Sequence, residues 1–226
     1  MKKLLVAGAV ALFGLSNAQI AKGTVYLSGQ AQFSQQNDNN DDSKNTNVTI
    51  VPTVGYFVAP NLAVGLGVGF QHTNKSFENT TSPVPNVFVT SEGKNIDNAV
   101  IVEPFVRKYW TLGDKLYFFG QLSVPMAFGS GKEEGSVTTV NNNVTPATTT
   151  TTTISEDKAK FTSVGVSIKP GLDYFLNKNW TIEATIGEFG YNTKKYDFDG
   201  AKSVENFNFG ANLSTVTIGV KYVFAK

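Results

Sequence analysis

Side chains capable of catalysis are scarce in this chain. His72 is the only histidine, and Thr73 and Ser76 follow it closely. An imidazole near a hydroxyl could act as a general base toward a nucleophile, as in a hydrolase. Such a base needs a third group to orient it, and no carboxylate in the local sequence is evident for that role. We therefore interpret His72 as a polar loop residue and predict no catalytic residue.

Metal and cofactor sites are equally poorly supported. There is no cysteine, so thiolate ligands are excluded, and NDNNDD at 37–42 lacks the spaced ligands and Glu of a calcium loop. Gly65, Gly67 and Gly69 alternate in a pattern that first suggests a phosphate-binding loop. However, a polar segment without helical periodicity follows them, and such a loop requires a helix there. We predict no metal site and no cofactor.

Ionisable side chains recur on one face of several alternating segments, as three acids and three bases. They are Glu103, Arg107, Lys169, Asp173, Glu183 and Lys221. Counted from the nearest short connection, four of them lie close to one rim, and Glu103 and Lys169 lie deeper. This spacing predicts two layers of compensating charge inside a small barrel. A charged pore is the functional interpretation, and a salt-bridged plug is the alternative that we favour, because a selectivity filter usually carries one sign of charge.

The elements that would position these charges are strands of period two. Aromatic residues and glycine are abundant, with 17 Phe, 8 Tyr and 21 Gly. Eight segments alternate apolar and small or polar residues, each about ten residues long, which suits a tilted bilayer crossing. They are 23–33, 47–58, 62–70, 100–110, 116–128, 163–176, 180–187 and 214–224.

The connections alternate between long and short. Tight turns join the second and third, fourth and fifth, and sixth and seventh segments. Long polar loops are expected at 34–46, 72–97, 130–160 and 192–205. Long loops at one rim and short turns at the other are typical of an outer-membrane barrel. The Thr-rich run TPATTTTTTISED is expected to be a mobile loop tip, with a local β-ribbon as the alternative.

The N-terminus predicts export. Lys2 and Lys3 precede an apolar run from Leu4 to Leu15, and the small residues Ser16 to Ala18 follow. This order is that of a secretory signal peptide, and the run is too short to span a bilayer as a helix. We therefore divide the chain into a cleavable signal peptide, 1–18, and a barrel domain, 19–226.

The apolar face of these strands could point inward, as in a soluble barrel, or outward into lipid. Gly65, Gly67 and Gly69 on the opposite face have no polar side chain for water to solvate, and their small size suits a crowded interior. Aromatic residues gather near the short-turn rim, where an aromatic girdle belongs. They are Tyr56, Trp110, Tyr174, Trp180, Tyr222 and Phe224. We predict an all-β fold, an eight-stranded antiparallel up-and-down transmembrane β-barrel with lipid outside.

The segments VEPFVRKYW, KPGLDYFLNKNWTIEATIGEFGY and STVTIGVKYVFAK carry a family resemblance. They resemble the small OmpA-like and OmpX-like outer-membrane β-barrels, and the resemblance covers nearly the whole mature chain. It implies the outer membrane of a Gram-negative-type bacterium, with both termini in the periplasm. It rests on pattern and carries no catalytic motif.

The function expected from these patterns is structural. A barrel with a filled lumen would serve in adhesion or as a barrier, with extracellular ligands contacting the long loops. The alternative is a narrow porin-like channel, and an outer-membrane enzyme is the hypothesis that we favour least. Nearly balanced charge, 19 Lys and Arg against 18 Asp and Glu, gives no reason to expect a nucleic-acid partner. Lipid is the expected partner, and a monomer is the expected state.

Overall fold

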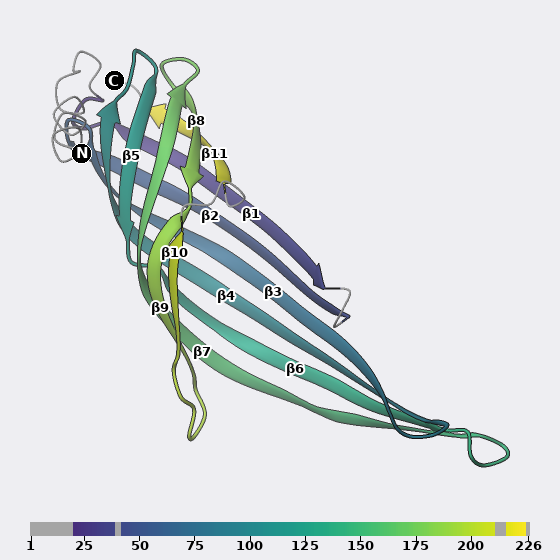
Figure 1. The fold of residues 1–226 in the computed structure, drawn as a ribbon. Helices are drawn as coiled ribbons and strands as arrows, with labels where there is room; N and C mark the ends of the chain where they lie inside the picture. The colour runs from purple at the N-terminus through teal and green to yellow at the C-terminus, as the bar shows by residue number, and fades with distance from the viewer. Residues whose placement is uncertain (1–19, 39–41, 211–215, 225–226) are drawn as a thin grey trace, which may run out of the picture.

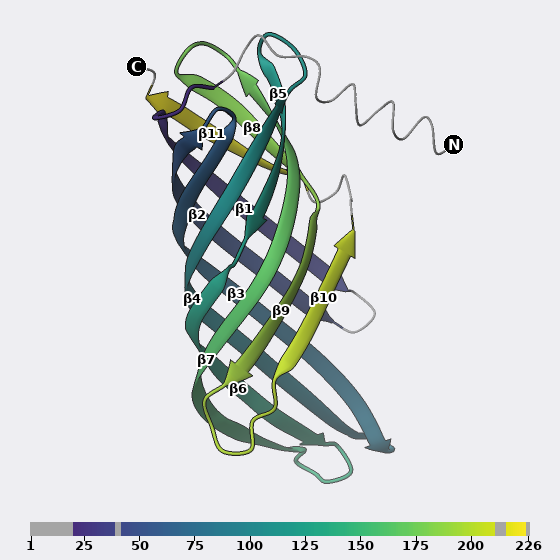
Figure 2. The same cartoon turned by 90° about the vertical axis from the view of Figure 1, so that its left-hand side faces the viewer.

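The computed structural model describes residues 20–38, 42–210 and 216–224, which form one antiparallel sheet (Figures 1 and 2). Its strands are β1 Val25–Asp38, β2 Ser43–Ala59, β3 Leu62–Val84, β4 Val87–Thr111, β5 Leu116–Ser123, β6 Met126–Asn141, β7 Thr148–Phe175, β8 Trp180–Ile186, β9 Glu188–Tyr196, β10 Val204–Gly210 and β11 Val216–Phe224. Within these described ranges, no helix has the length and apolar character to cross a membrane. The predicted signal peptide lies outside them.

The strand pairings return to their starting point. They lead from β1 through β2, β3, β4, β5, β7, β8 and β11 back to β1. β6 lies between β4 and β7, and β10 is paired with β9. The prediction of an all-β antiparallel fold is confirmed.

The prediction of eight strands differs from the structure, whose described residues form eleven. β5 and β6 share one register against β4, where Phe105 is opposite Ser123 and Val102 opposite Met126. They are separated at Pro125, whose missing N–H removes a ladder hydrogen bond. β8 and β9 are separated at Gly187, where φ is +78°. Residues 211–215, between β10 and β11, lie outside the described chain.

The short connections are turns, as predicted, and they lie at one end of the sheet, called here the turn end (Figure 1). β1 begins and β11 ends there, with Val25 opposite Phe224. At the first of these turns Asn61 has φ of +58°, and Pro60 precedes it. The same Pro-Asn order recurs at the far end, where Asn86 has φ of +62°. Asn tolerates this left-handed region and Pro presets the turn before it.

The expectation of long loops at the other end is largely wrong. Strands β3, β4, β6 and β7 continue through most of 72–97 and 130–160 as paired β-structure, called here the ribbon (Figure 1). Thr148 to Thr153, expected to be a mobile tip, pair with residues 136–141 of β6. Threonine has a high strand propensity, and a neighbouring strand was available to pair with it. The connection between β6 and β7 is limited to 142–147.

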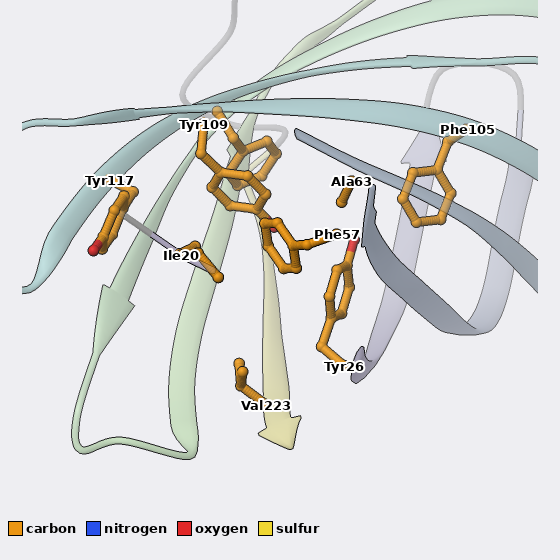
Figure 3. Packing of buried hydrophobic residues seen from close by; sticks show 9 residues of the cluster. Ile20, Tyr26, Phe57, Ala63, Phe105, Tyr109, Tyr117 and Val223 are labelled. Atoms are coloured by element: carbon orange, nitrogen blue, oxygen red, sulfur yellow. The ribbon is translucent and has the colours of Figure 1, made fainter. Parts of the chain in front are cut away.

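The two faces of the sheet differ as the alternation predicted. Leu66, Val100 and Val220 are 45%, 51% and 51% exposed on the outer face. The inner face is buried near the turn end, where an aromatic cluster forms the core (Figure 3). This cluster contains Ile20, Tyr26, Phe57, Ala63, Phe105, Tyr109, Tyr117, Phe119 and Val223. Apolar residues therefore lie both outside the sheet and at the closed end of its interior.

Candidate functional site: the charged interior

The six ionisable residues singled out from the sequence all lie on the inner face. Glu103 and Arg107 belong to β4, Lys169 and Asp173 to β7, Glu183 to β8 and Lys221 to β11. Strand periodicity explains this placement, because successive side chains of a strand point to opposite faces. Arg107 is 2% exposed, and Asp173, Glu183 and Lys221 are 0% exposed. The structure brings all six into connected ion pairs.

The layer nearer the turn end joins β4, β7, β8 and β11. The Arg107 Nη1 atom lies 2.6 Å from Glu183 Oε2, and Lys221 pairs with Asp173. Lys221 Nζ is also 4.0 Å from Glu183 Oε2. Arg107 and Lys221 both donate to the Tyr109 hydroxyl, at 3.2 and 3.1 Å. Two bases and two acids thus neutralise each other where burial would otherwise be costly.

The second layer lies farther from the turn end. Lys169 Nζ is 2.8 Å from Glu103 Oε1. Gln121 connects the layers, because its side-chain oxygen accepts from Arg107 Nε at 2.8 Å and its amide donates to Glu103 at 3.4 Å. The two-layer spacing expected from the sequence corresponds to this geometry.

The aromatic cluster around the layer nearer the turn end was not predicted from the sequence. The Arg107 guanidinium carbon lies 4.3 Å from the Phe119 ring centroid and 5.6 Å from that of Phe105. Such cation–π contacts strengthen when they are desolvated. A signal was present, because Tyr26, Phe57 and Tyr109 occupy the inward register, which was interpreted as small and polar. Figure 3 shows their rings gathered at the turn end of the interior.

A further ion pair was missed because both of its residues were assigned to loops. Lys194 Nζ of β9 lies 2.5 Å from Asp97 Oδ2 of β4. The same ammonium is 3.8 Å from the Phe161 ring centroid and 4.6 Å from that of Tyr196. Beyond the apolar stretch of a strand, hydropathy no longer identifies the residues as a strand, although their side chains still alternate between the two faces. This cluster ties β9 to β4 and β7 near the base of the ribbon.

The three predicted small residues line the interior on β3. A Cβ atom added at Gly67 would lie 2.9 Å from Val51 Cγ1 and 3.0 Å from Thr53 Cγ2. At Gly69 it would lie 2.8 Å from the Val51 Cα atom, and at Gly65 it would meet the Phe105 ring and the Val54 carbonyl oxygen. Glycine therefore permits the close approach of β2 and β4 side chains at this level.

The predicted girdle residues lie near the turn end. Tyr56, Tyr174, Trp180 and Phe224 are 44%, 47%, 46% and 45% exposed. Trp110 stacks beside Phe118 with ring centroids 5.5 Å apart, and Tyr222 is 4.9 Å from both Trp180 and Phe224. All six lie within three residues of a strand terminus at the turn end.

His72 lies on β3, opposite Asn98 of β4. Its Nδ1 atom lies 2.8 Å from Asn98 Oδ1, so its hydrogen-bond partner on β4 is an amide rather than a carboxylate. Across the part of the chain that the structure describes, no three His, Asp or Glu side chains gather as metal ligands. Residues 39–41 of the acidic segment 37–42 lie outside that part.

A polar cavity of about 490 Å³ lies on the ribbon side of the ion pairs. Glu103 and Lys169 line it, together with amide and hydroxyl side chains of β1, β2, β8, β9, β10 and β11. The interior is therefore occupied by rings and ion pairs at the turn end and is open above them.

The sequence matches the family described as outer membrane protein beta-barrel domain over residues 5–224. No curated protein matches it. Among solved structures, the N-terminal β-barrel domain of Pseudomonas aeruginosa OprF is 12% identical, covering 91% of this chain and 100% of that one, with a TM-score of 0.40. The attachment invasion locus protein Ail of Yersinia pestis is 14% identical, covering 90% and 99%, with a TM-score of 0.30.

Neisserial surface protein A is likewise 14% identical, covering 91% of this chain and 99% of that one, with a TM-score of 0.30. At these TM-scores the three structures support no inference about function. The family match spans nearly the whole chain, including every strand that supplies the ion pairs. The chain belongs to the outer membrane protein β-barrel family.

Proposed function

We propose that this protein is an outer-membrane barrel of eight strands, with a blocked lumen, whose ribbon contacts the cell's surroundings. In this proposal β5 with β6, β8 with β9, and β10 with β11 each act as one barrel strand. The turn end and both termini face the periplasm, and the ribbon faces outward. The protein is a monomer, and its role is adhesion or barrier formation rather than catalysis.

The observation that carries the proposal is the length of the ribbon strands. On β4 the outward apolar side chains run from Val100 to Trp110, which suits one tilted crossing of a bilayer. Residues 87–99 of the same strand continue beyond that band, for roughly 40 Å at the usual strand rise. β3, β6 and β7 continue beside them. A membrane anchor alone has no need of this extension.

The outward face of the ribbon offers hydrogen-bonding groups over four strands. Register places Thr80, Thr90, Thr138 and Thr151 in one row. Hydroxyls pair at 2.9 Å within the β3–β4 half of this row and at 3.1 Å within the β6–β7 half. A hollow of about 570 Å³ on the ribbon is bordered by Glu92 and Ser136. Such a surface suits contact with another macromolecule better than burial in lipid.

Removal of the ribbon should separate anchoring from surface contact. We expect a chain in which 78–92 and 134–153 are each replaced by a short turn to fold, because the ion pairs and aromatic cluster lie below the cut. Cells carrying it should attach at least tenfold less to a panel of glass, immobilised matrix protein and epithelial monolayers. Folding is checked by heat-modifiable migration in detergent gels.

Two results would contradict this proposal. One is attachment of the shortened chain equal to that of the full chain at the same surface level. The other is protection of the 142–147 connection from protease added to intact cells, which would place the ribbon inside. Cells without the protein supply the baseline for both assays.

A second candidate function, a narrow porin-like channel for ions or small solutes, is favoured by the 490 Å³ polar cavity. It would require a path past Arg107 and the aromatic cluster, which fill the turn end. The neutral pairing of that layer supports the plug over a selectivity filter of one charge sign.

A further inference from the structure

Glu188 lies on the inner face without a partner in the ion-pair network. A backbone irregularity gives it this orientation. Opposite β7, Gly171 pairs with Thr185 and Ile168 pairs with Phe189. An interval of three residues on β7 therefore faces an interval of four residues across β8 and β9. This is a β-bulge with one extra residue. Gly187, with φ of +78°, lies within it. A bulge of this kind changes the face to which the following side chains point.

The bulge turns Glu188 from the lipid side to the interior. Without it, strict alternation would place Glu188 on the same face as Ile182, which is 41% exposed on the outside. With it, Glu188 lines the luminal cavity, and Tyr191 lies on the outer face at 42% exposure. A bulge that re-aims a side chain is a recurrent device beside functional sites.

The Glu188 carboxylate is not neutralised by a neighbour. Within the described residues, no basic side chain lies within 4 Å of it, and Lys169 is held by Glu103 at 2.8 Å. The undescribed segment 211–215 reads ANLST and contains no basic residue. Apart from the mutually neutralising Asp97–Lys194 pair, the inner face from the cavity to the turn end then carries four acids, with Glu188 added to Glu103, Asp173 and Glu183. It carries three bases, so one negative charge is in excess.

The rest of the cavity wall supplies neutral hydrogen-bonding groups. Six of them are Gln30, Gln32, Thr49, Thr185, Asn192 and Asn208. Their amide and hydroxyl oxygens can accept hydrogen bonds. An ammonium group has three N–H donors and therefore requires acceptors in several directions. A bare metal ion is served less well, because the described residues bring no three His, Asp or Glu side chains together. A volume of about 490 Å³ is within the range of small-molecule sites.

We propose that the luminal cavity binds a small organic cation, a protonated amine, anchored by Glu188. The ammonium pairs with Glu188, and neighbouring amide and hydroxyl oxygens accept its remaining N–H groups. Lys169, on the same wall, competes with the ligand for the cavity's negative charge. Binding at this site requires neither a continuous channel nor contact by the ribbon. Its test is therefore independent of the test of the proposed function.

Calorimetric titration of the refolded full chain in detergent tests the site with three probes of equal length. We expect saturable binding of 1,5-diaminopentane, at least tenfold weaker binding of 1,5-pentanediol, and no binding of glutarate. This comparison needs no variant. Equal binding of the diamine and the diol would overturn the proposal, and so would the absence of diamine binding.

Two substitutions should shift the diamine affinity in opposite directions. Glu188→Gln has no ion pair to lose and should weaken binding at least tenfold. Lys169→Gln removes the competing base and should strengthen binding several-fold. Glu78→Gln on the exposed ribbon is the matched control and should leave the affinity unchanged. Unaltered affinity in folded Glu188→Gln would assign the binding to another part of the molecule.

Discussion

Replacement of Arg107 with methionine should lower the free energy of unfolding by about 3–5 kcal/mol, the usual cost of leaving one partner of a buried ion pair alone. The guanidinium is 2% exposed and contacts Glu183 at 2.6 Å and Gln121 at 2.8 Å. Methionine fills part of the volume but leaves Glu183 with no basic side chain closer than Lys221, at 4.0 Å, beside the Gln30 amide, which donates to it at 3.3 Å. Urea unfolding in lipid vesicles, followed by Trp110 and Trp180 fluorescence, measures the change.

A double-mutant cycle separates the ion pair from simple loss of packing. Arg107→Met combined with Glu183→Gln should be less destabilised than the sum of the two single variants, because the second change removes the stranded charge. Lys178→Met, in an exposed turn, is the control and should change stability by no more than about 0.5 kcal/mol. Strict additivity of the two inner substitutions would show that their charges are not coupled.

Phenylalanine at Gly67 should destabilise the fold by about 1–3 kcal/mol, the typical cost of overpacking a filled interior. A Cβ atom there already lies 2.9 Å from Val51 Cγ1 and 3.6 Å from Glu103 Cβ. A side chain there therefore displaces Val51 and Thr53 of β2 before its ring is placed. The fraction that folds into vesicles, read from heat-modifiable gel migration, measures the effect.

Leu66→Phe is the matched control one residue away. Leu66 is 45% exposed on the outer face, where lipid accommodates a larger apolar side chain. It should fold as efficiently as the unsubstituted chain. If Leu66→Phe instead blocked folding and Gly67→Phe did not, the assignment of inner and outer faces would be reversed.

Strand periodicity made much of the interior predictable. A period of two places Glu103 and Arg107 on the same face with no knowledge of tertiary structure, and opposite signs across strands follow from the cost of burying charge. Gly67 and Leu66 were assigned to opposite faces for the same reason. Alternation cannot predict a change of phase, and the bulge at Gly187 places Glu188 outside the register that β8 sets.

The ribbon and the aromatic cluster were not predicted from the sequence, for different reasons. Thr148 to Thr153 have no apolar face to mark them as a strand, and their pairing depends on β6 being alongside. Composition alone predicted a mobile tip. Tyr26 and Phe57 were visible on the inward register, but a polar lumen was expected there. In a narrow barrel, rings fill the interior as effectively as ion pairs do.

The central claim is that rings and ion pairs close the lumen at the turn end, and planar-bilayer recording of the full chain tests it most directly. Insertion is verified by heat-modifiable migration of the same preparation. We expect a flat current trace, with no discrete conductance steps at any applied voltage. Reproducible single-channel steps of one size would contradict it and would favour the porin-like channel.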